Sequence, residues 1–265
     1  MGIRRTQMKE IYIKTVDSTN LYLKNNPQKE DTILYTFNQT VGRGRENRNW
    51  LSLKDKNLAL SILLHPEKII SPIWLIAILS LSLTKILKKY KIKNYWIKWP
   101  NDIYIKNKKL AGVLAESEWQ EGKISRIIIG IGININNNEE DIEKIEKKAT
   151  SIFIETKKII DMNKFTKEYI KNVKRYFKIL NSKNGIEKIK KEYFLESNVI
   201  GKKAIWQNGV DTISGKVVNI TDDGIVLFEK DNYENGDFEK YDFANDNKKL
   251  IEIISGDLII ELFDF

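Results

Sequence analysis

The sequence contains no cysteine, and its 265 residues include a single histidine, His65. Without thiols the chain can form no disulfide, no thiolate nucleophile and no cysteine-based metal site. One histidine beside a proline cannot by itself anchor a metal or a Ser-His-Asp triad, so we interpret His65 as structural. These absences fit a reducing, cytoplasmic setting and exclude several common kinds of catalytic site.

Long apolar runs are also missing. Residues 1–14 include basic side chains but no apolar run of signal-peptide length, and the longest apolar segment, residues 73–83, is too short to span a bilayer. We therefore expect neither export nor membrane insertion. No GxxxxGK[ST] phosphate loop occurs. The run GIGINI at residues 130–135 lies in an apolar, strand-like stretch and opens no helix, which excludes a dinucleotide-binding fingerprint.

The net charge of +9 raises the question of a nucleic-acid partner. Lysine, isoleucine and asparagine are frequent along the whole chain, and glutamates stand between many of the lysines, so we interpret the charge as a compositional bias. A non-enzymatic basic nucleic-acid-binding protein stays an alternative of a different class. Against it, the arginines gather at one glycine-rich loop and form no stripe interleaved with exposed aromatics.

The first two thirds of the chain alternate between strand-like and helix-like patterns. Helices are expected at residues 17–26, 71–90, 163–180 and 186–195, the second with Ser71 as N-cap, Pro72 at its first position and lysines at its end. Strands are expected at residues 11–16, 32–40, 57–66, 95–99, 102–119 and 123–135, with a turn at Asn107 and Lys108 within the fifth. The short connections among the last three favour antiparallel pairing, which predicts an α+β fold with a mixed, mainly antiparallel sheet and flanking helices.

From about residue 199 the helical periodicity ends. Six short strand-like runs follow, at residues 201–207, 212–220, 224–230, 238–243, 249–254 and 257–263. Their regular spacing and their Gly and Asp turns predict a small closed β-barrel. We place the domain boundary near residue 198, which gives domains 1–197 and 198–265.

The run QTVGRGRENRNW at residues 39–50 combines three arginines, two glycines and a tryptophan. Such a loop suits a reaction in which a carboxylate attacks the α-phosphate of ATP, because that step needs cations to position two repelling anions and no protein nucleophile. Glycines let the backbone approach a ligand, and a loop that orders around the ligand can exclude water. On these residues alone, a solvated basic surface loop is the favoured interpretation.

Four further motifs accompany this loop in order: DSTN at 17–20, KWPND at 98–102, KKLAGVLAE at 108–116 and GIGININ at 130–136. Together the five motifs resemble those of the biotin protein ligases, also called biotin–[acetyl-CoA-carboxylase] ligases. The resemblance is dense over residues 10–136, and residues 214–228 and 252–260 resemble the small C-terminal barrel of the family. It implies a catalytic domain like that of class II aminoacyl-tRNA synthetases, followed by a Src-homology-3-like β-barrel.

The resemblance also implies an activity. Such an enzyme condenses biotin with ATP and Mg²⁺ to biotinyl-5′-AMP and pyrophosphate, and then transfers biotin to one lysine of the biotin carboxyl carrier domain of a carboxylase. Biotin is a substrate, and no tightly bound prosthetic group is implied. A lipoate ligase or octanoyl transferase, which shares the catalytic fold, is the alternative, although the GRGR loop and the KWPND motif favour biotin.

The resemblance assigns roles to matching positions. The implied catalytic residues are Lys109, Arg43 and Arg45. The implied biotin-binding residues are Ser18, Thr19, Asn20, Gln39, Gly42, Arg43, Gly44, Lys109 and Gly112. The implied ATP-binding residues are Arg45, Trp50, Lys98, Asn101, Asp102 and Asn134, and Asp102 is also assigned to Mg²⁺ through water. Strand alternation puts Lys108 on the face opposite Lys109.

Several of these side chains also have simpler interpretations. Ser18 and Thr19 could cap a helix, Trp50 could be a core aromatic, and Lys98 could be a solvated strand lysine. Trp99 is better explained as a core residue, and Glu116 as a structural partner of a nearby base.

The loop departs from the family pattern at Glu46 and Asn47, where basic or glycine residues are common, and at Asn49, where lysine is frequent. These departures concern the phosphate contacts of the loop and not the reaction. For the transfer step no side chain stands out as a general base, and the released AMP phosphate or water would serve equally.

The chain begins about ten residues before the first strand of the family pattern. We therefore expect no winged helix-turn-helix and no binding to a DNA operator. An exposed sheet edge could pair with a second copy of the chain, giving a homodimer, or with the carrier domain, but not with both at once.

Overall fold

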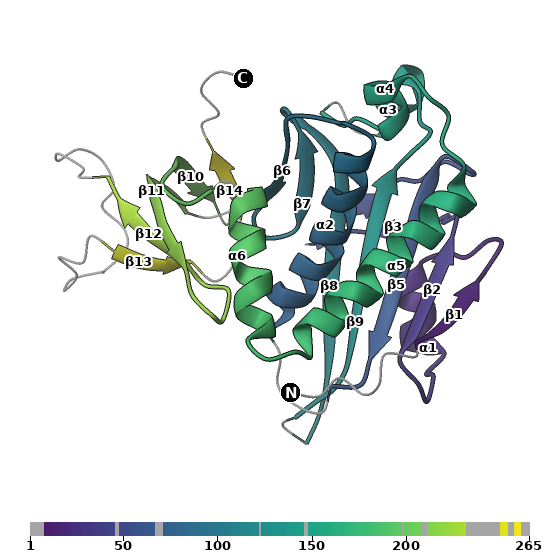
Figure 1. Ribbon diagram of the computed structural model, residues 1–265, viewed down its shortest axis with the longest axis horizontal. Coiled ribbons are helices and arrows are strands. Elements are labelled where there is room, and N and C mark those ends of the chain that lie inside the picture. Colours follow the sequence, from purple (N-terminus) through teal and green to yellow (C-terminus); the bar gives the residue numbers. More distant parts are fainter. Residues whose placement is uncertain are drawn as a thin grey trace.

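The computed structural model describes residues 8–45, 48–66, 71–121, 123–145, 148–197, 199–207, 211–231, 250–253 and 257–260. Its largest element is a seven-stranded sheet with the order β1-β2-β5-β9-β8-β7-β6 (Figure 1). The strands are β1 (Lys9–Tyr12), β2 (Thr32–Thr36), β5 (Asn57–Leu64), β6 (Tyr95–Lys98), β7 (Asp102–Ile105), β8 (Lys108–Gln120) and β9 (Lys123–Asn134). Only β1 and β2 pair in parallel, so the expected mixed, mainly antiparallel sheet is confirmed.

Two parts of the strand prediction differ from the structure. The first strand, predicted at residues 11–16, ends at Tyr12. Val16, at the end of the predicted range, forms an isolated bridge to Gln39. The second strand ends at Thr36. The arginine loop itself contains two short strands, β3 (Gly42–Arg43) and β4 (Asn49–Trp50), which pair antiparallel in a small ribbon.

The helices are α1 (Thr19–Asn25), α2 (Pro72–Lys89), α3 (Glu139–Ile145), α4 (Ile152–Thr156), α5 (Met162–Leu180) and α6 (Gly185–Ser197). The predicted start and end of α2 are confirmed, but the Ser71 hydroxyl does not cap it. That hydroxyl instead donates to the carbonyl of Asp223 at 2.7 Å, because the C-terminal sheet packs against this end of α2. The short helices α3 and α4 were not predicted, since each is too short to show a helical period.

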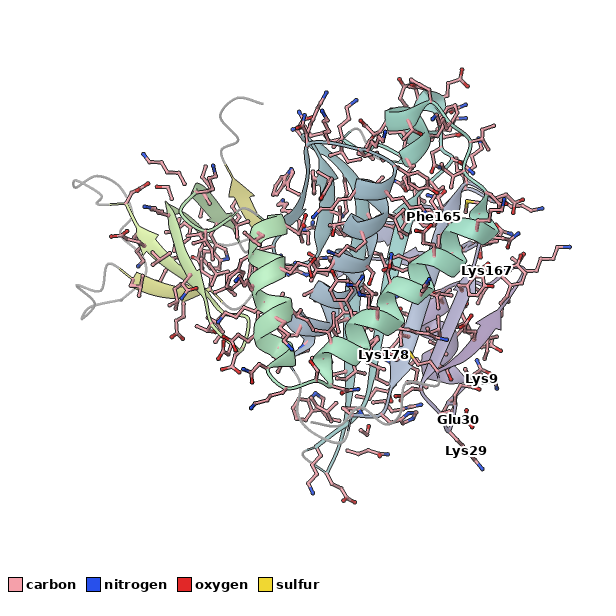
Figure 2. All side chains as sticks on the ribbon, viewed as in Figure 1. Lys9, Lys29, Glu30, Phe165, Lys167 and Lys178 are labelled. Carbon is pink, nitrogen blue, oxygen red and sulfur yellow. The ribbon has the colours of Figure 1, made fainter. Side chains whose placement is uncertain are left out.

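The helices cover the two faces of the sheet unequally. Helices α2 and α5 lie over one face (Figure 1) and share with it the main apolar core, in which the Tyr169 hydroxyl donates to the Leu79 carbonyl at 2.9 Å. Along α5, Phe165 is buried, whereas Lys167 and Lys178 are exposed, and all three are labelled in Figure 2. On the other face a smaller apolar cluster joins α1 to strands β2, β5 and β9. This second face is left open beside α1.

The C-terminal strands form a five-stranded antiparallel sheet with the order β13-β12-β11-β10-β14. They are β10 (Lys203–Gln207), β11 (Thr212–Ile220), β12 (Val226–Lys230), β13 (Leu250–Ile253) and β14 (Asp257–Ile260). Strands β13 and β14 are the two edges of this sheet, so over the described ranges the predicted closed barrel is not confirmed. The strand expected at residues 238–243 lies outside the described residues.

The C-terminal sheet packs directly on the main body. The Trp74 indole on α2 donates to the Asp222 carbonyl at 2.5 Å, and Lys190 on α6 pairs with the Asp222 carboxylate at 2.5 Å. Buried residues of this sheet, including Val217 and Phe228, continue the core of the main body. Among the helices described, none is long and apolar enough to cross a membrane.

Candidate functional site

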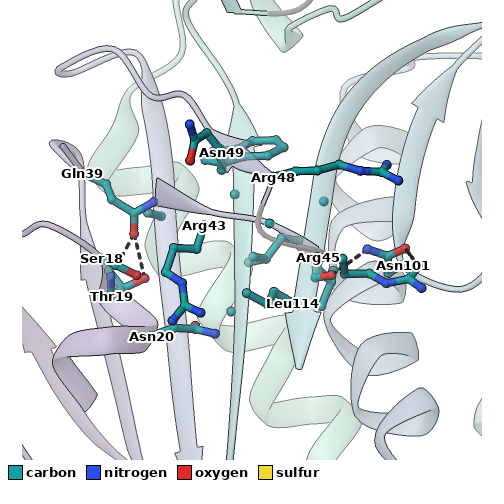
Figure 3. A pocket seen from close by; sticks show the side chains of 18 of the residues that line it. Ser18, Thr19, Asn20, Gln39, Arg43, Arg45, Arg48, Asn49, Asn101 and Leu114 are labelled. Carbon is teal, nitrogen blue, oxygen red and sulfur yellow. Dashed lines mark hydrogen bonds between the residues drawn. The ribbon is translucent and has the colours of Figure 1, made fainter. Parts of the chain in front are cut away.

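A cavity of about 240 Å³ opens on the α1 side of the sheet, beside the β3–β4 ribbon (Figure 3). It brings together residues that are far apart in the sequence. Of the predicted site residues, those that line it are Ser18, Thr19, Asn20, Gln39, Arg43, Gly44, Arg45, Trp50, Asn101, Asp102, Lys109 and Gly112. Gly130, Ile131 and Gly132 of the GIGININ motif line it as well, so all five motifs meet in one space.

One end of the cavity is a buried polar network. The backbone N–H and the hydroxyl of Thr19 donate to Gln39 Oε1 at 2.9 and 3.2 Å. The Ser61 hydroxyl lies 2.6 Å from both Thr19 Oγ1 and Asn20 Oδ1. Ser18 is the N-cap of α1, as expected, and its oxygen accepts from the Leu21 N–H. The cap uses only a lone pair, so the Ser18 hydroxyl hydrogen can still be donated to a ligand.

Glycine in β9 makes room for this network. A Cβ atom at Gly130 would lie 2.1 Å from Asn20 Oδ1 and 2.9 Å from the Ser61 hydroxyl oxygen. Any larger residue would push the polar side chains off the sheet. Glycine is thus required at position 130 because the Asn20 and Ser61 side chains approach the strand closely, and not because the backbone there has an unusual conformation.

The other end of the cavity is cationic. Lys109, Arg45 and Arg48 line the cavity, and Arg43, which also lines it, points back toward Asn20 of the polar network (Figure 3). Asp102 is the only carboxylate in the described lining. Asp102 Oδ2 pairs with Lys109 Nζ at 2.9 Å, while Asp102 Oδ1 is buried with no hydrogen-bond partner among the described residues. As strand alternation predicts, Lys109 faces the cavity whereas Lys108 is exposed. Such an excess of positive charge suits anionic ligands.

Trp50 lies against the sheet between the two ends. A Cβ at Gly132 would lie 2.2 Å from the indole, and one at Gly112 would lie 3.3 Å from it, so the ring packs on two glycines. The Lys109 ammonium lies 5.7 Å from the centre of the indole. The indole nitrogen is buried and has no acceptor among the described residues. Trp50 is therefore part of the cavity wall and not a residue of the main core.

Two contacts tie the β3–β4 ribbon to the sheet, and Figure 3 draws the one from Arg45 to Asn101. The Arg45 guanidinium donates to Asn101 Oδ1 at 3.2 Å, and Arg43 Nη1 lies 3.5 Å from Glu116 Oε1. Asn101 is held in turn, because its amide nitrogen donates to the Val113 carbonyl at 2.8 Å. The interpretation of Glu116 as a structural partner of a nearby base is confirmed.

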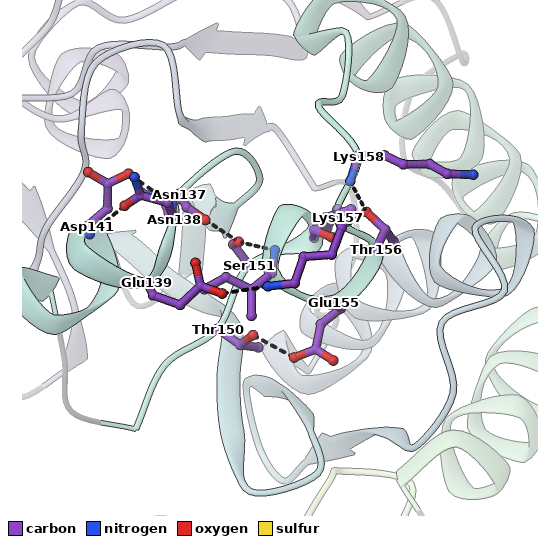
Figure 4. A network of polar contacts seen from close by, with 12 residues as sticks. Asn137, Asn138, Glu139, Asp141, Thr150, Ser151, Glu155, Thr156, Lys157 and Lys158 are labelled. Carbon is purple, nitrogen blue, oxygen red and sulfur yellow. Dashed lines mark hydrogen bonds and ion pairs between the residues drawn. The ribbon is translucent and has the colours of Figure 1, made fainter.

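The backbone of Lys109 is fixed by a segment that the sequence did not point to. The Lys109 N–H donates to the Lys148 carbonyl at 2.7 Å, and the Lys109 carbonyl accepts from the Thr150 N–H at 2.8 Å. Polar side chains hold this segment in place (Figure 4): the Thr150 hydroxyl donates to Glu155 at 2.7 Å, and the Ser151 hydroxyl donates to the Asn137 carbonyl at 2.6 Å.

Three of the predicted site residues do not line the cavity. Gly42 lies in the ribbon, where a Cβ would meet the Trp50 carbonyl at 2.2 Å. Asn134 is buried behind the cavity, where it accepts from Asn57 at 2.8 Å and donates to the Thr150 carbonyl at 3.0 Å. Lys98 is half-buried at the end of β6, with its ammonium 5.6 Å from the centre of the Tyr104 ring.

Two other interpretations are confirmed. Trp99 is a core residue with only 2% of its surface exposed. His65 Nδ1 lies 3.2 Å from Asp31 Oδ1, and the backbone N–H of His65 donates to the same oxygen at 2.9 Å. His65 therefore has a structural role.

Sequence reasoning missed Ser61 and the apolar walls of the cavity. Ser61 was detectable, because it is a lone hydroxyl residue within the fully buried run NLALSILL of β5. The apolar walls come from Ala59, Val113, Leu114 and Ile131, whose strand pattern is that of any core residue. Their location at the cavity follows only from the pairing of β5, β8 and β9.

A magnesium ion would find one carboxylate here. The described residues contain no group of three or more His, Cys, Asp or Glu side chains that could hold a metal ion. Mg²⁺ usually binds through one or two carboxylates together with water and substrate phosphates. Asp102, whose buried Oδ1 has no partner among the described residues, fits that mode of binding.

The fold and the cavity together define an α+β protein in which a polar cavity lies on a mixed sheet beside a basic ribbon. Residues 12–134 match the model of the Biotin/lipoate A/B protein ligase family.

Relatives with known names agree with the family match. A bifunctional ligase/repressor BirA of Bacillus spizizenii is 29% identical over 223 residues, which cover 82% of this chain and 67% of that protein. A biotin–[acetyl-CoA-carboxylase] ligase of Paracoccus denitrificans is 26% identical over 71% of this chain and 80% of its own length. The solved structure of the Aquifex aeolicus biotin protein ligase in complex with biotin and ATP matches with a TM-score of 0.75 and 29% identity, covering 95% of this chain and 98% of that one.

Proposed function

We propose that this protein is a biotin–protein ligase, which activates biotin with ATP and then transfers it to a lysine of a carrier domain. One observation carries the proposal: a single cavity joins a buried hydrogen-bonding network to four cations, three of which are arginines of the β3–β4 ribbon. A ligand with a polar head and a carboxylate at its other end fits this distribution of groups. The names of the relatives point to the same activity.

The polar end suits the ureido ring of biotin, which has one carbonyl acceptor and two N–H donors. Ser18, Thr19, Asn20 and Gln39 supply hydroxyl and amide groups of both kinds there. The apolar walls suit the rest of the ring system and the valeryl chain. Gly42, Gly44 and Gly112 serve this site by allowing backbone and side chains to approach closely.

In the first half-reaction a biotin carboxylate oxygen attacks the α-phosphorus of ATP. The new bond joins the acyl oxygen to phosphorus, the bond from the α-phosphorus to the bridging oxygen breaks, and pyrophosphate leaves with that oxygen. Lys109 holds the two anions together and offsets the charge that develops at phosphorus, and Arg43 and Arg45 close the site against water.

ATP would lie at the cationic end. Arg45, Asn101 and Asp102 face the phosphates, and Trp50 offers its face to adenine. Asp102 would hold Mg²⁺ through water, and when bound the ion supplies charge neutralisation of the phosphates.

Lys98 and Asn134 remain in the ATP-binding proposal although they lie outside the cavity lining. Each would have to exchange a present contact for a ligand contact: Lys98 its position over the Tyr104 ring, and Asn134 its bonds to Asn57 and Thr150.

In the second half-reaction the amine of the carrier lysine attacks the acyl carbon, an amide bond forms and AMP leaves. The amine must first lose its proton, and the AMP phosphate or water can accept it. The acceptor would be the biotin carboxyl carrier domain of a biotin-dependent carboxylase, consistent with the name of the Paracoccus denitrificans relative.

The decisive experiment is pyrophosphate exchange into ATP with magnesium, with biotin, lipoate or octanoate as the acid. The family model spans both biotin and lipoate enzymes, so the acid must be decided by measurement. We expect exchange with biotin only, because lipoate and octanoate would leave the polar end of the cavity without partners. Exchange with lipoate would move the protein to the alternative, and no exchange with any acid would reopen the non-enzymatic alternative.

The remaining proposals concern the whole protein. We propose a catalytic domain over residues 1–197 and a C-terminal domain over residues 198–265 that closes into a Src-homology-3-like barrel. A homodimer through a sheet edge, the absence of DNA operator binding and a cytoplasmic location stay predictions. Strands β1 and β6 are the two edges of the main sheet at which such pairing could occur.

A further inference from the structure

Glu116, on β8, bridges two parts of the site although it does not line the cavity. Its Oε2 accepts from the Asn20 amide nitrogen at 2.8 Å, and its Oε1 lies 3.5 Å from Arg43 Nη1. Asn20 belongs to the polar network at one end, and Arg43 belongs to the β3–β4 ribbon. One carboxylate therefore connects the wall that would hold biotin to the ribbon that would cover it.

The charge balance makes this carboxylate important for Arg43. Of the charged side chains that line the cavity, four are cations, and the single carboxylate, Asp102, is paired with Lys109. Glu116 lies 3.5 Å from Arg43, and opposite charges attract, so this carboxylate holds the arginine over the cavity. Figure 3 shows the Arg43 side chain directed toward Asn20, the residue that Glu116 also binds.

We infer that Glu116 is a positioning residue, which acts through Arg43 to hold the ribbon over the acyl-adenylate between the two half-reactions. The inference rests on the proposed function. Glu116 itself touches no substrate. Its contribution is the retention of biotinyl-5′-AMP until the carrier lysine arrives, because the ribbon would otherwise open and release the intermediate to water.

The expected effect is modest. The Arg43 and Glu116 side chains are 40% and 25% exposed, and ion pairs of that exposure contribute little. We expect removal of the Glu116 charge to raise the rate of adenylate release about two- to five-fold, as is typical of such pairs. The KM for ATP should change less than the release rate, since ATP would bind at the opposite end of the cavity.

The test variant is Glu116→Gln. Its amide keeps an oxygen that can accept from Asn20, but it loses the charge that attracts Arg43. Glu118→Gln is a matched control, because Glu118 lies on the same strand, is also 25% exposed, and pairs with Arg126, which does not line the cavity. The measurement is the release of labelled biotinyl-5′-AMP, formed on the enzyme without carrier and chased with unlabelled biotin.

A double-mutant cycle with Arg43→Ala separates positioning from a general structural effect. If Glu116 acts through Arg43, Glu116→Gln should accelerate release in the wild-type background and have no further effect in the Arg43→Ala background. Equal effects in both backgrounds, a release rate like that of Glu118→Gln, or slower release would each overturn the inference. Wild-type chain that forms no adenylate at all would refute the proposed function, and the role of Glu116 with it.

Discussion

The packing of Trp50 on Gly132 gives a prediction that can be worked from the structure. In Gly132→Ala the new Cβ would lie 2.2, 2.4 and 2.7 Å from three indole atoms, whereas ordinary contact begins at 3.4 Å. The backbone of Gly132 is not in the left-handed region and pairs with Ala59 and Gly112 in the sheet. Alanine therefore fits the strand, and the indole must retreat by roughly 1 Å.

Overpacking of this kind costs about 1–3 kcal/mol. If Trp50 forms the adenine side of the site, that cost falls on ATP binding, and kcat/KM for ATP should drop about 5- to 150-fold. The assay is biotin-dependent pyrophosphate exchange at varied ATP, with thermal melting as a check that the variant folds. Gly112→Ala, whose nearest indole atom would be 3.3 Å away, should disturb Trp50 less.

The Trp50→Leu variant tests whether the contact between the Gly132→Ala methyl group and the indole causes the loss of kcat/KM for ATP. In Trp50→Leu the indole is gone, so adding Gly132→Ala should reduce kcat/KM for ATP by much less than it does in the wild-type chain. An undiminished loss in that background, or a Gly132→Ala variant with wild-type kcat/KM for ATP, would refute the proposed packing role of Gly132.

Three further predictions follow from the same structure. Lys109→Ala should abolish pyrophosphate exchange without unfolding the chain, and near-normal exchange would contradict the assignment of Lys109. Ser61→Ala should lower the free energy of unfolding by about 1–3 kcal/mol in chemical denaturation, because it removes the hydroxyl that contacts the buried Asn20 Oδ1 and Thr19 Oγ1; an unchanged midpoint would argue against that network. Burial raises the pKa of Tyr95 to about 12 and that of Tyr169 well above its usual range. Tyrosines of the unfolded chain lose their protons near the ordinary tyrosine pKa of about 10, before those of the folded protein do. The stability of the fold should therefore be intact below pH 10 and fall as the pH rises toward 12. Melting temperatures measured across that pH range test this prediction, and a constant melting temperature would contradict it.

Much of the site could be predicted from the sequence because its motifs are local. The GRGR loop, the KWPND turn and the Lys109 strand are short motifs that together resemble those of the biotin protein ligases, and the cavity collects twelve of the residues that this resemblance implies. The failures have a common cause. Ser61 and the 148–151 segment act through partners more than thirty residues away, and no local pattern records such contacts.

The sequence by itself determined the order of the longer helices and strands of the main body, the antiparallel pairing of β6 to β9, the cap of α1 and the choice of Lys109 over Lys108. These depend on periodicity, turn length and capping, which act between residues that are near in the chain. Only the tertiary structure decided that Asn134 lies behind the cavity, that Trp50 rests on two glycines, and that Glu116 bridges Asn20 and Arg43. Those facts depend on strand register and on charge balance within a folded cavity, which arise when distant segments come together.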